Sequence, residues 1–421
     1  MIASVKGTRD LLPPDTRVWN RVEAVAREVF ALYAFEEIRT PVLESTELFV
    51  RSVGESSDIV HKEMYTFTDR GGRSVTLRPE NTAGVARAFV EHGMAQAGFV
   101  RKLYYLGPQF RYERPQKGRY REFRQIGAEV LGAADAATDA ELLVMLFDFL
   151  GRLGFTGLSV SLNSVGTDAC RPAYIEAVRA FFSSNERELG GDDKRRLAEN
   201  PLRVLDSKDP AVQDSLREGT FPNILDFLDE ESRLHHETLL GLLGAAEIPY
   251  RIEPRLVRGL DYYTRTVFEV TSRGLGAQDA LLGGGRYDRL VADLGGPRTP
   301  GIGFAIGEDR LVDVLPEAFR REALSAVSVV ALVPLEAGDR ADALALASEL
   351  RRAGVAVDLE AAGKGPGHGL KTAEKKGLKA AILLGERERA SGTAVLKDLS
   401  ARTQETLSRA DLIAKLKGWH P

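Results

Sequence analysis

The sequence contains little of what builds covalent cross-links, metal clusters or membrane spans. Its 421 residues include one cysteine, Cys170, which excludes an internal disulfide and a thiolate-rich zinc site. We expect this side chain to be a small buried hydrophobe. No apolar run reaches the roughly 18–20 residues that cross a bilayer, and the first ten residues lack the apolar core of a signal peptide. These absences predict a cytoplasmic protein that does not enter a membrane.

A strong excess of charge of either sign is also lacking. The formal net charge is −4, which mildly disfavours a nucleic-acid partner. This argument is weak, because large RNA-binding enzymes can concentrate their basic residues locally. Hydrophobic residues make up 43% and charged residues 28% of the chain, which is ordinary for a globular protein. At about 100–200 residues per domain, the length predicts two or three domains.

The common phosphate-binding motifs are missing as well. A run of three glycines, 283–285, is followed by Arg286 and Tyr287 rather than by Lys and Ser or Thr, so it is not a P-loop. The chain also has no Gly-x-Gly-x-x-Gly fingerprint within a βαβ unit. The glycine run either lets the backbone approach a ligand closely or forms a plain turn, and the sequence leaves both alternatives open.

The first part of the chain predicts helices and antiparallel strands. Apolar periodicity predicts helices over 15–34, capped by Asp15, and over 81–92 and 138–153. Residues 35–38 and 41–43 are expected to form a buried extended segment. Asp69-Arg70-Gly71-Gly72 is a strong turn signal between the strands 64–67 and 74–77. Two further antiparallel strands, 102–112 and 121–131, are joined by the polar loop 113–120.

The rest of the chain predicts an insertion and a second domain. Residues from about 171 to 247 alternate charged and aliphatic residues at helical spacing and predict a mostly helical insertion. Strands follow at 250–253, 267–270 and 301–306, the last of which enters a helix near Glu308. From 326 the pattern is α/β, with a buried strand at 327–333, a helix at 339–353 and strands at 356–359, 380–384 and 393–397. Residues 316–326 are the expected linker. The predicted domains are therefore 1–325 and 326–421.

The segment from Phe110 to Gln125 carries the first chemical signal. Six basic residues lie between 111 and 125 and alternate with aromatic residues. Arginine suits a polyphosphate and an aromatic ring can stack on a base, so the segment favours an ATP site. The alternative is the charged tip of a solvated hairpin.

Two further segments carry chemistry only in combination with the first. Arg258-Gly259-Leu260-Asp261-Tyr262-Tyr263 pairs an arginine with two tyrosines, although tyrosine pairs are commonly core or interface residues. The strand 301–307 leads to Arg310 at the start of a helix, where the helix dipole disfavours a cation. Such an arginine needs an anionic partner, which is either a nucleotide phosphate or a nearby carboxylate.

Together these segments resemble the class II aminoacyl-tRNA synthetases. Their three class motifs match residues about 35–45 with Pro41, about 103–131, and 301–311. Within that class, Arg258–Tyr263 and Gly283–Asp288 resemble the peptides specific to the histidyl-tRNA synthetases, and 6–10 and 77–80 fit the same family. The resemblance covers essentially the whole chain. It implies an α+β fold with an antiparallel sheet flanked by helices, a helical insertion, a C-terminal α/β anticodon-binding domain, and a homodimer built partly around Pro41.

The resemblance also implies an activity and a set of site residues. The expected reaction joins L-histidine to its tRNA through histidyl-adenylate, with ATP as a substrate and Mg²⁺ as the metal, although the sequence fixes no protein ligand for the ion. The residues implied for ATP are Arg111, Glu113, Arg119, Phe123 and Arg310. Those implied for histidine are Glu80, Thr82, Arg111, Gln125, Glu129, Arg258, Tyr262 and Tyr263. Arg258, Arg111 and Arg310 are the expected catalytic residues.

Two departures from the family pattern and two alternatives remain. The family usually has glycine where Asn81 and Arg289 stand; asparagine tolerates left-handed backbone angles, and Arg289 flanks its motif. One alternative is a non-catalytic regulatory paralogue acting in histidine biosynthesis, which is expected to lack the anticodon domain. Another is a class II synthetase for a different amino acid.

A lysine-rich stretch in the second domain also leaves two alternatives. Residues 364–379, with five lysines and His368, are either a contact for the anticodon stem or a flexible solvated loop.

Overall fold

The computed structural model describes residues 2–417 except 55, 56, 58, 115–117, 185–188, 200, 208, 218–220, 273–279, 326–328 and 361–365. The chain divides into two compact units, Met1–Arg320 and Arg321–Pro421. Five predicted segments fall partly outside the described residues: the loop 113–120, parts of the insertion 171–247, the end of the linker 316–326, the start of the strand 327–333, and the start of the lysine-rich stretch 364–379. In the part of the chain that is described, no helix has the length and apolar character to span a bilayer.

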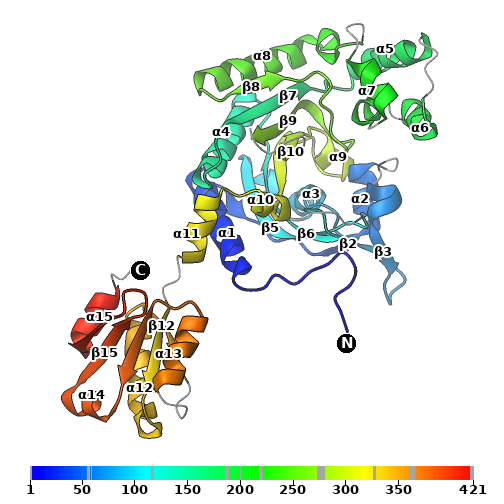
Figure 1. Ribbon diagram of the computed structural model, residues 1–421. Helices are drawn as coiled ribbons and strands as arrows, with labels where there is room; N and C mark the ends of the chain where they lie inside the picture. Colours follow the sequence, from blue (N-terminus) through cyan, green and yellow to red (C-terminus); the bar gives the residue numbers. More distant parts are fainter. Residues whose placement is uncertain are drawn as a thin grey trace. The chain divides into compact units, whose positions relative to one another are not determined.

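An eight-stranded sheet forms the centre of the first unit (Figure 1). In spatial order its strands are β1 (Glu36–Glu37), β5 (Arg101–Phe110), β6 (Glu122–Leu131), β11 (Gly301–Gly307), β10 (Ala280–Arg286), β9 (Thr264–Ser272), β7 (Leu158–Ser164) and β8 (Tyr250–Ile252). The six inner strands pair antiparallel, whereas the two edge strands β1 and β8 pair parallel to their neighbours. This confirms the predicted antiparallel sheet and the α+β class.

Three long helices cover one face of this sheet. They are α1 (Asp15–Leu32), α4 (Ala136–Arg152) and α8 (Glu230–Ala245), of which α4 packs against both others. Phe30 of α1 stacks on Tyr104 of β5 at 4.7 Å and lies 6.4 Å from Phe304 of β11, measured between ring centroids. Because side chains alternate along a strand, Tyr105, Glu129 and Gly303 face the opposite side.

A small sheet and short helices flank the large one. The predicted hairpin is confirmed as β3 (Tyr65–Thr68) and β4 (Ser74–Leu77), with β2 (Leu43–Ser45) on the other edge of β4. Asp69 stabilises the turn, since its Oδ1 accepts hydrogen bonds from the backbone N–H groups of Gly71 and Arg73. The remaining elements are α2 (Thr46–Val53), η1 (Ile59–Glu63), α3 (Thr82–Glu91), η2 (Met94–Ala97), α9 (Leu290–Asp293) and α10 (Glu308–Asp313).

The predicted helical insertion is present. It consists of α5 (Arg171–Ser184), α6 (Gly191–Glu199), η3 (Pro201–Asp206), α7 (Pro210–Leu216) and η4 (Ile224–Phe227), and it continues into α8. Its apolar core, in which Tyr174 and Val178 of α5 pack with Val204 and Val212, continues into the large sheet at Val267 of β9. Cys170, just before α5, is buried as expected.

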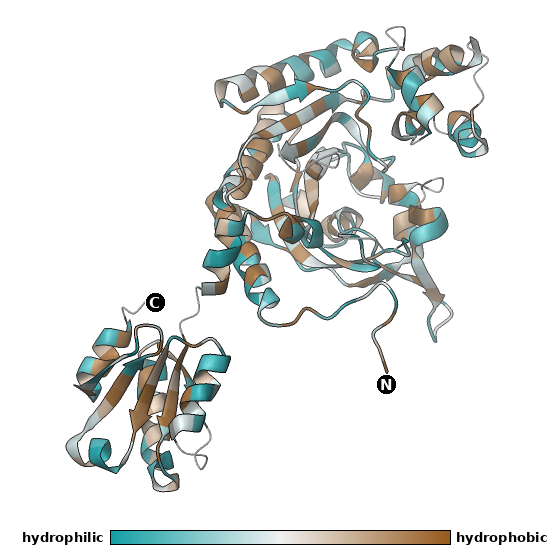
Figure 2. Ribbon diagram, in the orientation of Figure 1, coloured by the Kyte–Doolittle hydropathy of each residue, from teal (hydrophilic) through white to brown (hydrophobic). Residues whose placement is uncertain are grey.

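The second unit is built on a five-stranded sheet. The strand order is β13 (Ala356–Leu359), β12 (Val329–Pro334), β14 (Ala380–Leu384), β15 (Thr393–Asp398) and β16 (Thr403–Ser408). Its helices are α12 (Arg340–Arg352), α13 (Pro366–Lys375), α14 (Glu386–Ser391) and α15 (Arg409–Lys417). The first three strands pair parallel. Of these, β12 and β14 are apolar along their length and form the buried centre of the unit, whereas β13 is an edge strand that carries Asp358 (Figure 2).

The structure decides two points that the sequence left open and changes one prediction. The glycine run 283–285 is not a turn but lies inside β10, in the middle of the large sheet. The expected linker is largely the helix α11 (Glu317–Ser325), because Phe319 and Ala323 are four residues apart and both are buried. Residues 366–375 form α13 rather than a flexible loop.

Smaller differences concern the first helix and the strands. Asp15 is the first helical residue and not the cap, since the cap position holds Pro14 without a side-chain hydrogen bond. The extended segments near β1 and β2 are less buried than expected: Glu36 and Glu37 are exposed and Leu43 is 49% exposed. Strands β7 and β16 had no predicted counterpart. Leu158, Val160 and Leu162 of β7 do alternate with polar residues, so this strand was missed although its signal is present, whereas β16 is almost wholly polar.

Candidate active site

Two adjoining pockets lie on the sheet face opposite α1 and α4. The larger has a volume of about 450 Å³ and the smaller of about 150 Å³. Arg111, Arg258, Gly283 and Ala305 line both of them, so the two pockets meet at these four residues. All twelve site residues expected from the sequence line one pocket or the other.

The smaller pocket collects the residues expected to hold the amino acid. Strands β6, β10 and β11 form its floor, and the segment 258–263 and the start of α3 form its walls. It is lined by Glu80, Thr82, Arg111, Gln125, Glu129, Arg258, Leu260, Tyr262, Tyr263, Gly283, Tyr287, Gly303, Phe304 and Ala305. Burial of Glu80, Thr82, Gln125, Glu129 and Tyr262 makes it a polar chamber inside an apolar core.

Glu129 is the polar centre of the smaller pocket. Its Oε1 accepts hydrogen bonds from Thr82 Oγ1 at 2.7 Å and from the Tyr105 hydroxyl at 3.2 Å, and its Oε2 accepts one from the Tyr287 hydroxyl at 2.5 Å. Burial raises the pKa of Glu129 to about 8, although these three hydroxyl groups lower it in part. The carboxyl group is therefore held in one orientation and readily takes up a proton.

Glycines on neighbouring strands make room for these side chains. A Cβ atom on Gly303 would lie 1.7 Å from Glu129 Oε2, and one on Gly127 would lie 2.3 Å from the Tyr105 ring. Glu129 pairs across the ladder with Gly303 itself, and Tyr105 with Gly127. Each functional side chain thus lies over a bare stretch of backbone.

The start of α3 holds two further residues of the smaller pocket. Glu80 accepts hydrogen bonds from the backbone N–H groups of Thr82 at 2.7 Å and Ala83 at 2.9 Å, so it closes the helix N-terminus. Burial raises its pKa, against the effect of these bonds and of Arg111. Arg111 is held in place by a 2.8 Å hydrogen bond from its Nε to the carbonyl oxygen of Pro79.

The larger pocket collects the residues expected to hold ATP. Arg111, Glu113, Arg119, Phe123 and Arg310 all line it. The Arg111 guanidinium lies 5.3 Å from the centre of the Phe123 ring, and Glu113 lies 3.9 Å from Arg111 and 3.5 Å from Arg119. An aromatic ring next to several arginines is an arrangement that suits a base and its phosphates.

Arg258 lies where the two pockets meet. Its Nη1 donates a 2.5 Å hydrogen bond to Glu269 Oε1 on β9. Its guanidinium also occupies the space over Gly283, where a Cβ atom would lie 2.5 Å from Arg258 Cζ. The glycine run therefore does allow a close approach to the backbone, but the group that approaches it in this structure is the Arg258 side chain and not a ligand.

Sequence reasoning missed several residues that line the pockets or support the side chains in them. Tyr105 and Tyr287 hold Glu129, and Glu269 holds Arg258. Tyr287 lies within the family peptide Gly283–Asp288. The face of the sheet to which its side chain points depends on the register of β10 and was not predictable from the motif. The insertion contributes Arg195, Arg196, Glu199 and Arg203 to the larger pocket. The charged stretch 192–196 was a signal for these, but it indicated only a helix.

The two departures from the family pattern differ in their surroundings. Asn81 precedes α3 with a φ of −116°, so the expected tolerance of left-handed angles is not what accommodates it. Its Oδ1 accepts a 2.7 Å hydrogen bond from Thr40 Oγ1. Arg289 pairs with Asp168 at the surface and lines neither pocket.

Comparisons with known proteins agree with this geometry. The family model described as histidyl-tRNA synthetase matches residues 7–311, and the model described as anticodon binding domain matches residues 329–419. The chain is 50% identical to a histidine–tRNA ligase of Koribacter versatilis, covering 98% of this chain and 95% of the relative. It is also 49% identical to a histidine–tRNA ligase of Anaeromyxobacter dehalogenans, covering 99% of this chain and 100% of that relative.

A solved structure is similar over the same extent. The crystal structure of apo histidyl-tRNA synthetase from S. aureus matches with a TM-score of 0.81 at 35% identity, covering 99% of this chain and 100% of that one. The similarity therefore includes the sheet, the insertion and the second unit.

Proposed function

This chain belongs to the histidyl-tRNA synthetase family, and we propose that it joins L-histidine to the 3′ end of its tRNA. In the first step ATP and histidine give histidyl-adenylate and pyrophosphate. In the second step the histidyl group passes to the terminal ribose of the tRNA. Full-length similarity to ligases of this kind supports the activity, and the match of 329–419 to an anticodon-binding model supports the tRNA partner.

The meeting of the two pockets at Arg111 and Arg258 is the observation that carries this proposal. When a carboxylate attacks the α-phosphorus of ATP, two negatively charged groups must come together. Arginines fixed before the substrates bind neutralise that charge without reorganisation. Arg111 is fixed by Pro79 and Arg258 by Glu269, so both satisfy this requirement.

The larger pocket is the proposed ATP site. Arg111 and Arg310 would hold the phosphates, and Phe123 would stack on the adenine. Glu113 and Arg119 would complete the nucleotide site, where their mutual ion pair orients both side chains. Arg310 is the third residue of the six-residue helix α10 and lines the larger pocket, which supports its role.

The smaller pocket is the proposed histidine site. Glu80, Thr82 and Gln125 would hold the α-amino group, and Arg258 would contact the reacting carboxylate. Glu129 and Tyr263 would pair with the imidazole, which offers one donor and one acceptor in its neutral form, with Tyr262 nearby. A volume of about 150 Å³ fits a single amino-acid side chain rather than a nucleotide.

Mg²⁺ is the proposed metal and would enter with the ATP. Such an ion usually takes one or two carboxylates together with substrate phosphates and water. The carboxylates of Glu113 and Glu269 line the larger pocket and fit this need. The bound ion would add positive charge at the phosphates.

We further propose a cytoplasmic homodimer. The support for the dimer is the small sheet near Pro41, where Leu43 is 49% and Phe67 is 47% exposed. The strand register places both side chains on the same face of this sheet, and an exposed apolar face is typical of an interface. The molar mass in solution, measured by light scattering, tests it: a monomer at micromolar concentration would contradict the proposal.

The regulatory paralogue is the less supported alternative. Such a protein is expected to lack the anticodon domain and to have lost catalytic residues. Here the second unit is present, and Arg258, Tyr262, Tyr263 and Arg310 all line the pockets.

Histidine-dependent exchange of pyrophosphate into ATP tests the first step, and charging of histidine tRNA tests the second. We expect both activities. Absence of exchange would overturn the enzymatic proposal, and exchange that depends on another amino acid would overturn the assignment of histidine.

A further inference from the structure

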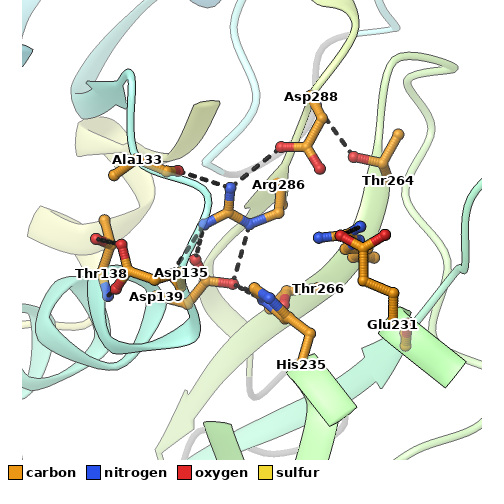
Figure 3. Close-up of polar contacts among 12 residues, drawn as sticks. Ala133, Asp135, Thr138, Asp139, Glu231, His235, Thr264, Thr266, Arg286 and Asp288 are labelled. Atoms are coloured by element: carbon orange, nitrogen blue, oxygen red, sulfur yellow. Dashed lines mark hydrogen bonds and ion pairs between the residues drawn. The ribbon is translucent and has the colours of Figure 1, made fainter. Parts of the chain in front are cut away.

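A buried cluster of polar side chains lies behind the smaller pocket, on the helix-covered side of the sheet. At its centre is Arg286 of β10, which has no exposed surface (Figure 3). Its Nη1 donates to the carbonyl oxygen of Ala133 at 2.9 Å and to Asp288 Oδ1 at 3.1 Å, and its Nη2 to the carbonyl oxygen of Asp135 at 3.3 Å. The guanidinium group also forms a two-point ion pair with Asp139 of α4.

Asp139 joins four elements of the fold. Its Oδ2 accepts hydrogen bonds from Thr266 Oγ1 of β9 at 2.7 Å and from His235 Nε2 of α8 at 2.9 Å, besides that from Arg286 Nε. Burial alone would raise the pKa of Asp139, but the hydrogen bond from His235 and the charge of Arg286 outweigh it and lower the pKa. The cluster is therefore a charged pair in which the carboxylate is fully satisfied.

The cluster is one residue away from the smaller pocket. The three residues before Arg286 are glycines, which offer no side chain to hold the strand, and the pairing of β10 with β9 shifts register between Gly285 and Arg286. The next residue, Tyr287, points to the opposite face and donates its hydroxyl to Glu129. Arg286 is thus the first side chain after the glycine run that can fix the end of β10.

We propose that Arg286, clamped by Asp139, is a positioning residue for the amino-acid pocket. It fixes the end of β10 against α4 so that the Tyr287 hydroxyl reaches Glu129 and orients its carboxyl group. This inference rests on the proposed function, because it gives the cluster a role in binding histidine. It goes further in assigning that role to a cluster that lies outside both pockets.

A charge-balanced double variant tests the proposal. Removing one partner alone would leave an uncompensated charge in the core, whereas removing both charges is often tolerated. Arg286→Met combined with Asp139→Asn removes both, and the new amide oxygen still accepts from Thr266 and His235. We expect the KM for histidine to rise by roughly tenfold to a hundredfold, and the KM for ATP to change by less than about twofold. Arg289→Ala is the matched control, since Arg289 is nearby in sequence but pairs only at the surface.

Backbone amide hydrogen exchange at Tyr287 and Asp288 gives a readout that needs no substrate. We expect faster exchange in the free double variant than in the parent and in the Arg289→Ala control. A folded double variant with the parental KM for histidine and parental exchange would overturn the proposal. If the double variant does not fold, Arg286→Lys is measured in its place, with the same expected direction and the same overturning result.

The same experiment separates this inference from the proposed function. A parent protein without histidine-dependent activity would contradict the function, while the hydrogen-exchange comparison would still show whether Arg286 fixes the strand. An active parent whose double variant is unchanged would contradict the inference alone.

Discussion

Arg258 and Glu269 are joined by a hydrogen bond of 2.5 Å across the point where the two pockets meet. Glu269 lies on β9, so the rigid sheet sets the direction of a side chain that belongs to an irregular segment. Both side chains are about 30% exposed, at 28% and 29%, so Arg258 is fixed on one side and open to substrate on the other.

This arrangement predicts a selective loss of chemistry in Arg258→Ala. Because the arginine contributes most when charge develops at the reacting phosphate, we expect the rate of ATP–pyrophosphate exchange to fall about 100-fold to 1000-fold. Histidine affinity, measured by calorimetry, should weaken far less. Arg255→Ala serves as the control, since Arg255 lies three residues earlier and lines neither pocket. Equal losses of rate and affinity in Arg258→Ala would refute the assigned role.

Replacement of Glu129 should act mainly on histidine. In Glu129→Ala the hydroxyl groups of Thr82, Tyr105 and Tyr287 lose their shared acceptor, and a pocket built on such bonds loses discrimination strongly when one is removed. We expect the KM for histidine to rise by about 100-fold or more, with little change in the KM for ATP. The isosteric Glu129→Gln separates the loss of charge from the loss of volume. An unchanged KM for histidine in both variants would show that Glu129 does not read the substrate.

The buried carboxyl group of Glu308 predicts a dependence of stability on pH. Burial raises the pKa of Glu308 from 4.5 to about 8, and nearby Glu23 raises it further while Arg124 lowers it. Between these two values the folded state keeps a proton that the unfolded state has lost. The contribution of this group to the free energy of unfolding should therefore be highest below pH 4.5. It should decline as the pH rises towards 8, by at most about 1.4 kcal/mol per pH unit.

Urea unfolding between pH 5 and 8 checks this prediction. Glu308→Gln cannot lose a proton, so its stability should decline less steeply with pH than that of the parent. The exposed Glu237 provides the control, because Glu237→Gln should leave the slope unchanged. Parallel pH profiles for the parent and Glu308→Gln would contradict the raised pKa.

The space above Gly303 predicts a large effect from a single methyl group. In Gly303→Ala the new Cβ atom would meet Glu129 Oε2, which must then move and lose its bond with Tyr287. We expect histidine binding to weaken by at least about tenfold and stability to fall by about 1–3 kcal/mol. Gly241→Ala is the control, because Gly241 lies within α8 with no atom near its Cβ position and should gain stability. Parental binding by a folded Gly303→Ala variant would show that the pocket tolerates movement of Glu129.

Long periodic segments and recognisable peptides were predictable from the sequence. The helix α4 and the strand pair β5–β6 are confirmed because their apolar residues repeat at the spacing of one element over many residues. The expected site residues, from Glu80 to Arg310, were named from family peptides, and the structure brings all of them to two pockets. Their individual roles stay predictions until the variants above are measured.

What the sequence could not reveal depends on contacts between distant segments. Glycines 283–285 have weak strand propensity, yet β9 and β11 hold them in the centre of a sheet on both sides. Tyr105 and Glu269 have no motif of their own, and their importance appears only when the strand register places them beside Glu129 and Arg258. Asp139 and Arg286 are 147 residues apart, so no local pattern could indicate their pairing.

The glycines beneath Glu129 and Tyr105 restrict how this pocket can change during evolution. Glu129 occupies the volume that a side chain at Gly303 would need, and Tyr105 occupies that at Gly127. A mutation that enlarges either glycine therefore collides with Glu129 or with Tyr105, which holds it, and a mutation that shortens one of these side chains leaves a void over the glycine. A change in amino-acid preference would therefore require coordinated substitutions on adjacent strands, and no single substitution at these positions would be sufficient.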